Sequence, residues 1–450
     1  NGGVPCTGPS QTFDITVKPL GQVNDPANQL LCNGSDTDPV NFTTTHTVGT
    51  TSYAWENNNT SINLAAAGTG DIPAFTATNT GTSPVTATIE VTPTFTNNGI
   101  PCEGPSETFT IIVNPTAQVD DPDDQYVCHD QTTTVDFTTQ NTGGTTFYAW
   151  TNDNAGIGLA ASGSGNISFI ATNTGTSPTT GTITVTPTFT NGGVPCTGPS
   201  QTFDITVNPL GQVNDPADQE LCNGASTNTV TFGTNNTGGT TTYEWINDNT
   251  DIGLAGSGSG GSIPSFTATN TTSVPITGTI TVTPTFVNGG TGCEGSSETF
   301  TITVNPTPAV TSASTKTICD NTDVDYDITS NVTGTTFTWT ASVTLAPTGG
   351  TITGFSDCSG SCGSTITQTL DNTGTSPGEV TYVITPTGPS PTDCEGDPFN
   401  LVVTVQPYPD VIATPTSETI CNGSSTNIDL STNITDETVT YTWTAANTSG

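Results

Sequence analysis

The sequence predicts an all-β protein built as a tandem array of immunoglobulin-like β-sandwich domains. Val, Ile, Phe and Thr alternate in short runs between clusters of Gly, Asn, Pro and Thr, and no segment shows helical periodicity over a useful length. The chain also repeats with a period near one hundred residues, which is the size of a whole domain. Each period holds about seven expected strands with a tryptophan in the third, the pattern of an immunoglobulin-like sandwich.

Comparison of the chain with itself establishes the array. Residues 1–34 and 191–224 differ at only three positions. Two series of cysteines recur every 94–102 residues. The first series is Cys32, Cys128, Cys222, Cys319 and Cys421, and the second is Cys6, Cys102, Cys196, Cys293 and Cys394. An aromatic-x-Trp motif recurs between them, and its tryptophans are expected in the core: Trp55, Trp150, Trp245, Trp339 and Trp443.

The repeats end in a strand that alternates apolar residues with Thr and then reaches Val-Asn-Pro or Val-x-Pro, as after Phe109, Ile111 and Val113. A residue before proline is held extended, so short semi-rigid joints are expected there. The expected domains are a partial domain at 1–19 with a last strand only, repeats at 20–115, 116–209 and 210–306, a divergent repeat at 307–407 and a partial repeat at 408–450. Pro93 and Pro187 interrupt the preceding strand, so a bulge or an edge is expected at each.

The composition excludes whole classes of partner. The 450 residues include two lysines and no arginine, only 9% are charged, and the formal net charge is -38. Nucleic-acid binding and attachment to anionic membrane surfaces both need clustered Lys and Arg. No run of eighteen apolar residues exists. The sequence therefore predicts neither nucleic-acid binding nor direct membrane insertion.

Twelve cysteines without a Cys-His zinc pattern predict disulfides formed in an oxidising compartment. Pairing within a repeat, which we favour because each unit is then self-sufficient, would join Cys32 to Cys102, Cys128 to Cys196, Cys222 to Cys293 and Cys319 to Cys394. Simple sandwich topology, however, places those two cysteines at opposite poles. Pairing with the hairpin of the next repeat, such as Cys32 with Cys196, would instead staple neighbours. Cys358 and Cys362 should close a small loop of their own.

The joints hold the strongest candidate for a metal site. Carboxylates gather just after the first three complete joints, at Asp25, Asp120, Asp121, Asp123, Asp124, Asp215 and Asp218. Ca²⁺ takes roughly six to eight oxygen ligands, so calcium could stiffen these joints. The alternative is that Asn-Asp-Pro forms a turn with solvated carboxylates, in which case no cofactor is required.

Candidate catalytic residues are few. His46 and His129 lie at unrelated positions of different repeats, and both are expected to be exposed loop histidines. No Ser-His-Asp order, phosphate loop or His-Glu-x-x-His motif occurs. We therefore expect no enzymatic activity from this segment.

Several recurring phrases resemble the PKD-like immunoglobulin-type repeats of giant Bacteroidetes cell-surface adhesins, including those of gliding motility. These phrases include Leu-Cys-Asn-Gly, Tyr-x-Trp-x-Asn-Asp-Asn, Ala-Thr-Asn-Thr-Gly-Thr-Ser-Pro and Thr-Phe-x-Ile-Thr-Val-Asn-Pro. The resemblance covers nearly the whole chain and is weaker across residues 337–362. It implies an extended rod, secretion across the outer membrane by the type IX route, and display on the bacterial cell surface.

The function that this resemblance implies is a structural stalk or filament segment of a large secreted adhesin, continuing into further repeats of the same chain. Two alternatives stay open. The repeats themselves could bind polysaccharide or another surface, or they could be spacers of a secreted carbohydrate-active enzyme. Exposed aromatic side chains would favour the first alternative, and a catalytic domain elsewhere in the protein would favour the second.

Overall fold

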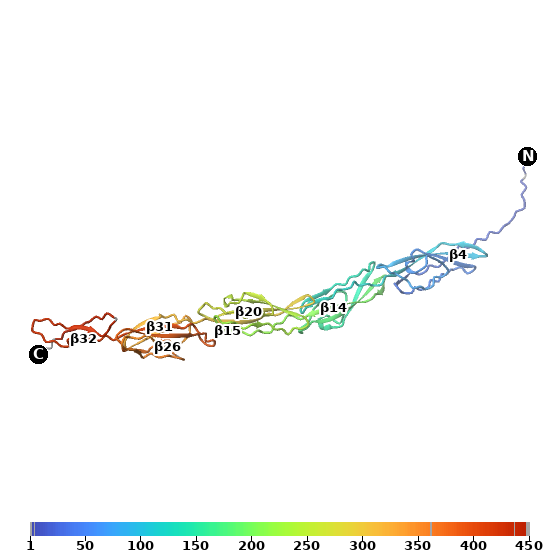
Figure 1. The fold of residues 1–450 in the computed structure, drawn as a ribbon. Coiled ribbons are helices and arrows are strands. Elements are labelled where there is room, and N and C mark those ends of the chain that lie inside the picture. Colours follow the sequence, from blue (N-terminus) through green and yellow to red (C-terminus); the bar gives the residue numbers. More distant parts are fainter. Residues whose placement is uncertain (1, 4, 361, 436, 447–450) are drawn as a thin grey trace. The chain divides into compact units, whose positions relative to one another are not determined.

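The computed structural model describes residues 2–3, 5–360, 362–435 and 437–446. These residues form β-strands and three one-turn 3₁₀ helices, without an α-helix, which confirms the predicted all-β class (Figure 1). Among them, no helix is long and apolar enough to cross a membrane. The chain packs as two compact units. The first comprises Asn1–Leu210, Asn236–Thr240 and Phe286–Cys293, and the second comprises Gly211–Asn235, Thr241–Thr285 and Glu294–Gly450.

The first unit opens with a sheet in the order β1-β6-β4-β2-β3, and β5 pairs with the far end of β4. β1 runs parallel to β6, and the other neighbours are antiparallel. Isolated bridges between Asp36 and Thr76 and between Val40 and Ile72 mark the opposing layer. The elements are β1 (Gln29–Cys32), β2 (Thr50–Asn57), η1 (Thr60–Ile62), β3 (Ala67–Thr69), β4 (Val85–Asn97), β5 (Ile100–Glu103) and β6 (Glu107–Asn114).

The second repeat copies this topology. Its main sheet has the order β10-β9-β12-β14-β7, with β13 on the end of β12, and β8 and β11 form the opposing layer. β7 is again parallel to the last strand, β14. The elements are β7 (Gln125–Cys128), β8 (Thr132–Val135), β9 (Thr145–Asn152), η2 (Ala155–Ile157), β10 (Ser162–Ser164), β11 (Ile167–Ile170), β12 (Thr179–Asn191), β13 (Val194–Thr197) and β14 (Gln201–Asn208).

The third repeat supplies most of its residues to the second unit. Its main sheet has the order β15-β22-β20-β17-β18, with β21 on β20, and β16 and β19 form the opposing layer. The elements are β15 (Gln219–Cys222), β16 (Val230–Thr231), β17 (Thr240–Asn247), η3 (Thr250–Ile252), β18 (Ser257–Ser259), β19 (Ser262–Ile263), β20 (Ile276–Asn288), β21 (Thr291–Glu294) and β22 (Glu298–Asn305).

The fourth repeat keeps the main sheet, in the order β23-β31-β30-β26, but replaces the rest with two small sheets, β24-β29-β27 and β25-β28. A final pair, β32 and β33, follows it. The strands are β23 (Thr315–Cys319), β24 (Thr322–Asp323), β25 (Tyr326–Asp327), β26 (Thr336–Leu345), β27 (Ile352–Thr353), β28 (Thr365–Ile366), β29 (Thr369–Asn372), β30 (Gly378–Thr387), β31 (Phe399–Gln406), β32 (Val411–Thr414) and β33 (Asp429–Thr432).

Each core is built from the alternation visible in the sequence. Along β12, for example, Ile183, Val185 and Phe189 are buried and the intervening threonines are part-exposed. Four separate hydrophobic clusters result, and each draws on one expected repeat. The exact domain boundaries stay predictions.

Four of the five recurrent tryptophans lie in these cores. Trp55, Trp150, Trp245 and Trp339 are 6–7% exposed. Trp443 is 79% exposed, so the expectation that it packs in a core is wrong. In the first repeat, β2 carries Trp55 and pairs with β4, a strand of 13 residues that follows it in the chain. Only seven residues follow Trp443 in this sequence, so they cannot supply a strand of that length.

Of the two alternatives expected at the prolines inside the long strands, a bulge or an edge, the structure has a local edge. Pro187 keeps continuous register with Tyr148 of β9. On the other edge of β12, β14 pairs with the residues before the proline and β13 with the residues after it. Pro187 therefore lies in the gap between two partner strands, a local edge where no amide donor is needed, and its carbonyl accepts a hydrogen bond from the Gly198 amide. Pro93 lies in the matching gap between β6 and β5.

Candidate functional site

Three long-range disulfides join consecutive repeats, and each lies inside one compact unit. They link Cys32 to Cys196, Cys128 to Cys293 and Cys222 to Cys394, with Cα atoms 5.5 Å apart in each. A first-series cysteine thus always pairs with the second-series cysteine of the following repeat. The favoured pairing within a repeat is wrong, and the alternative pairing of Cys32 with Cys196 is present.

The register of the first strand explains the pairing. Cys32 ends β1 opposite Asn114, the last residue of β6, at the pole where the chain leaves the repeat. Cys102 precedes the start of β6 at Glu107. The two cysteines of one repeat therefore lie at opposite ends of an eight-residue strand, about 25 Å apart. A disulfide needs Cα atoms within about 7 Å, which only the next hairpin provides.

A reciprocal amide pair accompanies the first two bridges. Asn191 donates from Nδ2 to Asn114 Oδ1 at 3.0 Å, and Asn114 Nδ2 donates to the Asn191 carbonyl at 3.3 Å. Asn208 and Asn288 repeat both bonds, at 2.9 and 3.1 Å. Asn114 and Asn208 are fully buried. These are the asparagines of the Val-Asn-Pro endings, so the side chain before each of these joint prolines fixes the next hairpin.

Sequence reasoning missed this pair, although a signal existed. Asn97, Asn191 and Asn288 recur at the end of the long strand, two residues after a phenylalanine. At residue 18, which aligns with Asn208, the side chain is lysine instead, and Lys18 Nζ donates to the Asn97 carbonyl. The lysine thus donates to the same hairpin carbonyl that the joint asparagine uses elsewhere.

In the first two bridges, the side chain two positions before the first-series cysteine packs on a glycine of the next repeat's hairpin. A Cβ placed on Gly192 would lie 2.4 Å from Leu30 Cδ2, and one on Gly289 would lie 2.1 Å from Tyr126 Cδ1. Both glycines have positive φ, 60° and 59°. A side chain at either position would therefore be strained and would also clash with the neighbouring repeat.

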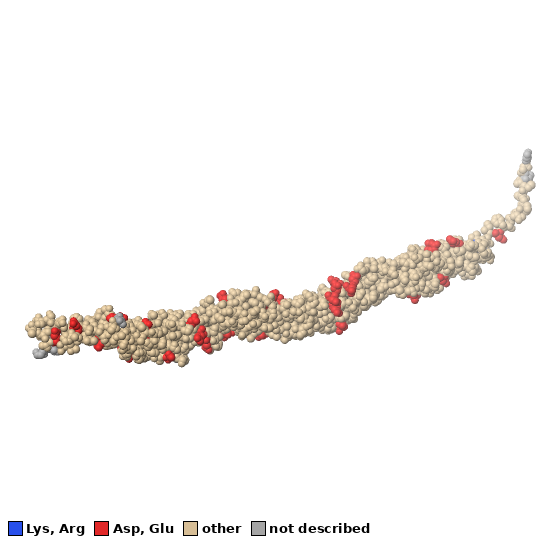
Figure 2. Space-filling model, in the orientation of Figure 1, with Lys and Arg blue, Asp and Glu red and all other residues tan. Residues whose placement is uncertain are grey.

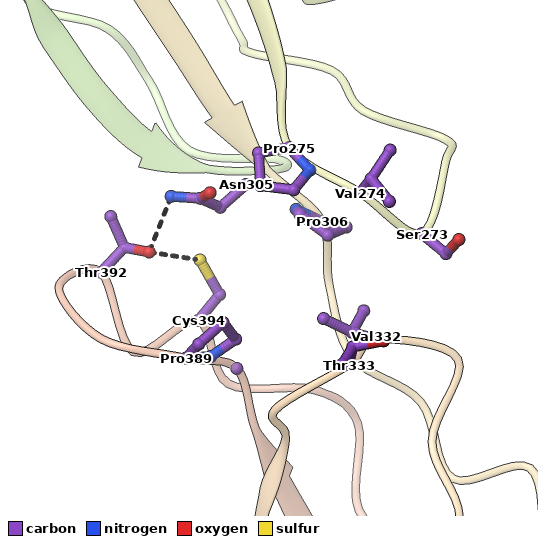
Figure 3. A pocket seen from close by; sticks show the side chains of 11 residues that line it. Ser273, Val274, Pro275, Asn305, Pro306, Val332, Thr333, Pro389, Thr392 and Cys394 are labelled. Carbon is purple, nitrogen blue, oxygen red and sulfur yellow. Dashed lines mark hydrogen bonds between the residues drawn. The ribbon is translucent and has the colours of Figure 1, made fainter.

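The third bridge is built differently (Figure 3). Asn305 Nδ2 donates to Thr392 Oγ1 at 2.9 Å, and that oxygen lies 3.4 Å from Cys394 Sγ. A cavity of about 100 Å³ opens beside these groups, lined mainly by the apolar side chains of Val274, Pro275, Pro306, Val332 and Pro389. Ligand pockets usually enclose about 300 to 1,000 Å³. This cavity is a packing defect at the joint rather than a ligand site.

Of the remaining cysteines, Cys358 and Cys362 form the expected small loop. Four described cysteines are unpaired: Cys6, Cys102, Cys319 and Cys421. The expected bridges Cys32–Cys102 and Cys319–Cys394 are absent, because Cys32 is bonded to Cys196 and Cys394 to Cys222.

Three of the seven joint carboxylates, those of Asp120, Asp124 and Asp218, accept hydrogen bonds from the backbone or from neighbouring side chains. Asp124 Oδ1 accepts from the Asp204 amide at 2.8 Å, and Asp218 Oδ1 accepts from the Thr301 amide at 2.6 Å. Hydrogen bonds from Thr138 and Gln140 lower the pKa of the Asp120 carboxyl. Within the described part of the chain, the side chains of Asp25, Asp121, Asp123 and Asp215 are not brought together in a shared ligand set.

The described residues contain no group of three or more His, Cys, Asp or Glu side chains arranged to hold a metal ion. On the face in Figure 2, acidic side chains are scattered in small groups over a mostly uncharged surface. The calcium sites at the joints therefore stay a prediction.

The Asn-Asp-Asn triplets that follow two of the tryptophan strands form Asx turns rather than ligand sets. Asn154 caps η2 by accepting from the Gly156 amide at 3.0 Å, and Asn249 caps η3 by accepting from the Asp251 amide at 3.1 Å. These side chains shape the loop after the tryptophan strand.

The two histidines are less exposed than expected. His129 Nδ1 accepts a hydrogen bond from the Asn173 amide at 3.0 Å, the role that Asn33 plays toward Asn79 in the first repeat. His46 packs on Phe95 with ring centroids 4.6 Å apart. Both are structural contacts of single repeats, and neither histidine lies with a nucleophile or a metal-ligand set.

Comparison with known families matches one repeat. Residues 316–409 match the PKD-like domain. This is the repeat in which the sequence resemblance is weakest, so the divergent second layer still belongs to the same class of module. No curated protein matches the chain.

Solved structures give distant likenesses. Against the N-terminal eight immunoglobulin domains of Down syndrome cell adhesion molecule, the identity is 12% with a TM-score of 0.33, covering 86% of this chain and 49% of that one. Against Drosophila N-cadherin EC1-4, the identity is 13% with a TM-score of 0.26, covering 85% and 99%. Against the human desmocollin-1 ectodomain, the identity is 12% with a TM-score of 0.28, covering 88% of this chain and 83% of that one. The chain spans about half the length of the first of these.

The repeats and bridges together define the type of molecule. Immunoglobulin-like and PKD-like sandwiches joined by disulfides are extracellular-type modules, because disulfides persist in oxidising compartments. They form a structural or adhesion-related array.

Proposed function

We propose that this chain is a stalk segment of a large secreted bacterial cell-surface adhesin of the gliding-motility type. The observation that carries the stalk function is the recurrence of one covalent joint: Cys32–Cys196, Cys128–Cys293 and Cys222–Cys394 repeat the same connection three times. The bacterial adhesin and gliding-motility part of the proposal rests on the sequence resemblance of the repeats. A surface that binds a ligand needs one well-formed set of convergent groups, whereas a stalk needs identical connections. The recurrent features here concern joints and cores.

The packing of the aromatic residues argues against polysaccharide binding by the repeats. Sugar-binding surfaces present exposed aromatic rings, but the recurrent tryptophans at 55, 150, 245 and 339 are buried. Phe147 is 61% exposed, yet its equivalents in the first and third repeats are Ser52 and Thr242. An exposed ring that does not recur cannot give the array a repeated binding site.

Deletion of two whole repeats tests the stalk function. Removal of residues 20–209 from the gene in the producing cell keeps the repeat register and should shorten the surface structure while attachment persists. Electron microscopy gives the length, and an adhesion or gliding assay gives the activity. Loss of attachment with normal surface display would show that these repeats bind the ligand, and the stalk proposal would be wrong.

A further inference from the structure

The bridges divide the chain into short connecting segments and long bypassed stretches. In 102–128, 196–222 and 293–319 the chain advances 26 positions from a second-series cysteine to the next first-series cysteine. Each segment contains the last strand of one repeat, the joint proline and the first strand of the next, as with β14 and β15 in 196–222. In the first two segments, the disulfide at the end then crosses to the hairpin of the following repeat.

We propose that the disulfides form two interleaved covalent load paths that carry tension past the bodies of the repeats. One path follows residues up to Cys32, crosses to Cys196, continues to Cys222 and crosses to Cys394. The other follows 102–128, crosses from Cys128 to Cys293 and continues to Cys319. This inference rests on the proposed stalk function, because a stalk is the part of an adhesin that bears tension.

Covalent length shows why the paths matter. Unfolding an unbridged repeat of this size would lengthen the chain by about 330 Å of contour, at about 3.5 Å per residue. In the bridged chain, tension between Cys32 and Cys394 acts on 196–222, which spans at most about 90 Å when fully extended. Residues 33–195 and 223–393 lie inside the loops closed by the two bridges, so tension on the ends of the chain cannot extend them.

The last strand of a load-bearing segment is hydrogen-bonded to a neighbouring strand on each side. β14 lies between β12 and β7, with seven residues in register on one side and four on the other. The joint asparagine at the end of the strand is buried and paired with the next hairpin. Strand, joint and bridge therefore form a continuous connection in which hydrogen bonds resist shear before the disulfide is loaded.

Single-molecule force spectroscopy of the full chain, tethered beyond residues 1 and 450, tests the inference. The oxidised chain should reach a final extension of about 410 Å, because only 1–32, 196–222 and 394–450 lie on the shortest path. With dithiothreitol, which gives two electrons and two protons to each disulfide, the same chain should reach about 1,600 Å. The expected change is about fourfold.

Matched variants separate the bridges. Cys358→Ser with Cys362→Ser opens a loop that is not on the path, so the limit should stay near 410 Å. Cys32→Ser with Cys196→Ser should raise it to about 900 Å, since the other two bridges remain. Repeat-sized steps in the oxidised wild type, or a final extension near the reduced value, would overturn the inference. If the final extension of the oxidised chain stays at about 410 Å but the strain that lacks residues 20–209 loses attachment, the load paths stand and only the stalk function is contradicted.

Discussion

The tryptophan of each of the first three repeats lies against a glycine, and the contact leaves no room for a side chain. A Cβ on Gly258 would lie 2.3 Å from Trp245 Cζ2, and Gly163 meets Trp150 in the same way. Gly258→Ala should therefore lower the free energy of unfolding of the third repeat by about 1–3 kcal/mol, because the ring is confined by the core. Hydrogen exchange along β17 and β18 measures the effect.

Gly261→Ala is the control for this prediction, since Gly261 is in the same repeat and a Cβ added there would have nothing within 4 Å. Its exchange rates should match the wild type within error. Equal acceleration of exchange in both variants would show that backbone freedom, rather than the Trp245 contact, explains the glycine.

At the residue scale the sequence identified the repeated motifs but only some of their roles. The Ser-Gly-Ser-Gly phrase is plain in the sequence, yet its contact with Trp150 depends on how β10 pairs with β9. The joint asparagines were visible as part of Val-Asn-Pro. Their partners, such as Asn288 for Asn208, are 80 residues away, and no local rule joins them.

At the scale of elements, a side chain latches the first strand to the last strand in each of the first three complete repeats. Asp218 precedes β15 and accepts from the Thr301 amide of β22, and Asp124 does the same for β7 and β14. Asn28 takes this role before β1, accepting from the Thr110 amide. An uncharged amide therefore works as well as a carboxylate at this position, which favours a hydrogen-bonding role.

Asp218→Ala should loosen the start of β15 and cost about 0.5–1.5 kcal/mol, the net worth of one hydrogen bond. Asp218→Asn should retain wild-type stability, as Asn28 indicates. Thermal unfolding with calcium or with a chelator completes the test. Stabilisation by Ca²⁺ that disappears in Asp218→Asn would mean that the carboxylates are ligands, and the latch interpretation would be incomplete.

The cysteine pairing shows why the connections between elements are harder to predict than their existence. Alternation in the sequence locates β6 and β31, but it does not state that the first strand runs parallel to the last strand of its own repeat. That register places Cys32 beside Asn114 and therefore at the exit pole. The position of Pro187 could not be predicted for the same reason. The break between β13 and β14 that accommodates this proline is a property of the assembled sheet.

At the scale of the whole molecule, the tandem array and its all-β class follow from the sequence, because period and alternation are local properties repeated many times. The disulfide connectivity does not follow from the sequence. Three bridges with sequence separations of 164 to 172 residues enclose overlapping stretches of chain. Each such closure stabilises the folded state by about 5 kcal/mol in a chain-entropy model. The overlap means that every peptide bond between Cys32 and Cys394 is spanned by at least one bridge.

A single cut in a joint between Cys32 and Cys394 should therefore leave the chain in one covalent piece. The loop at 214–218 is mostly exposed and is spanned only by Cys128–Cys293, so a protease recognition sequence inserted after Asp215 places the cut where it discriminates. After cleavage we expect one band on a non-reducing gel and two fragments after reduction. Cys128→Ser with Cys293→Ser should release both fragments without reductant. Separation of the wild-type fragments under non-reducing conditions would mean that cysteines pair within their own repeats, since no within-repeat bridge crosses this loop.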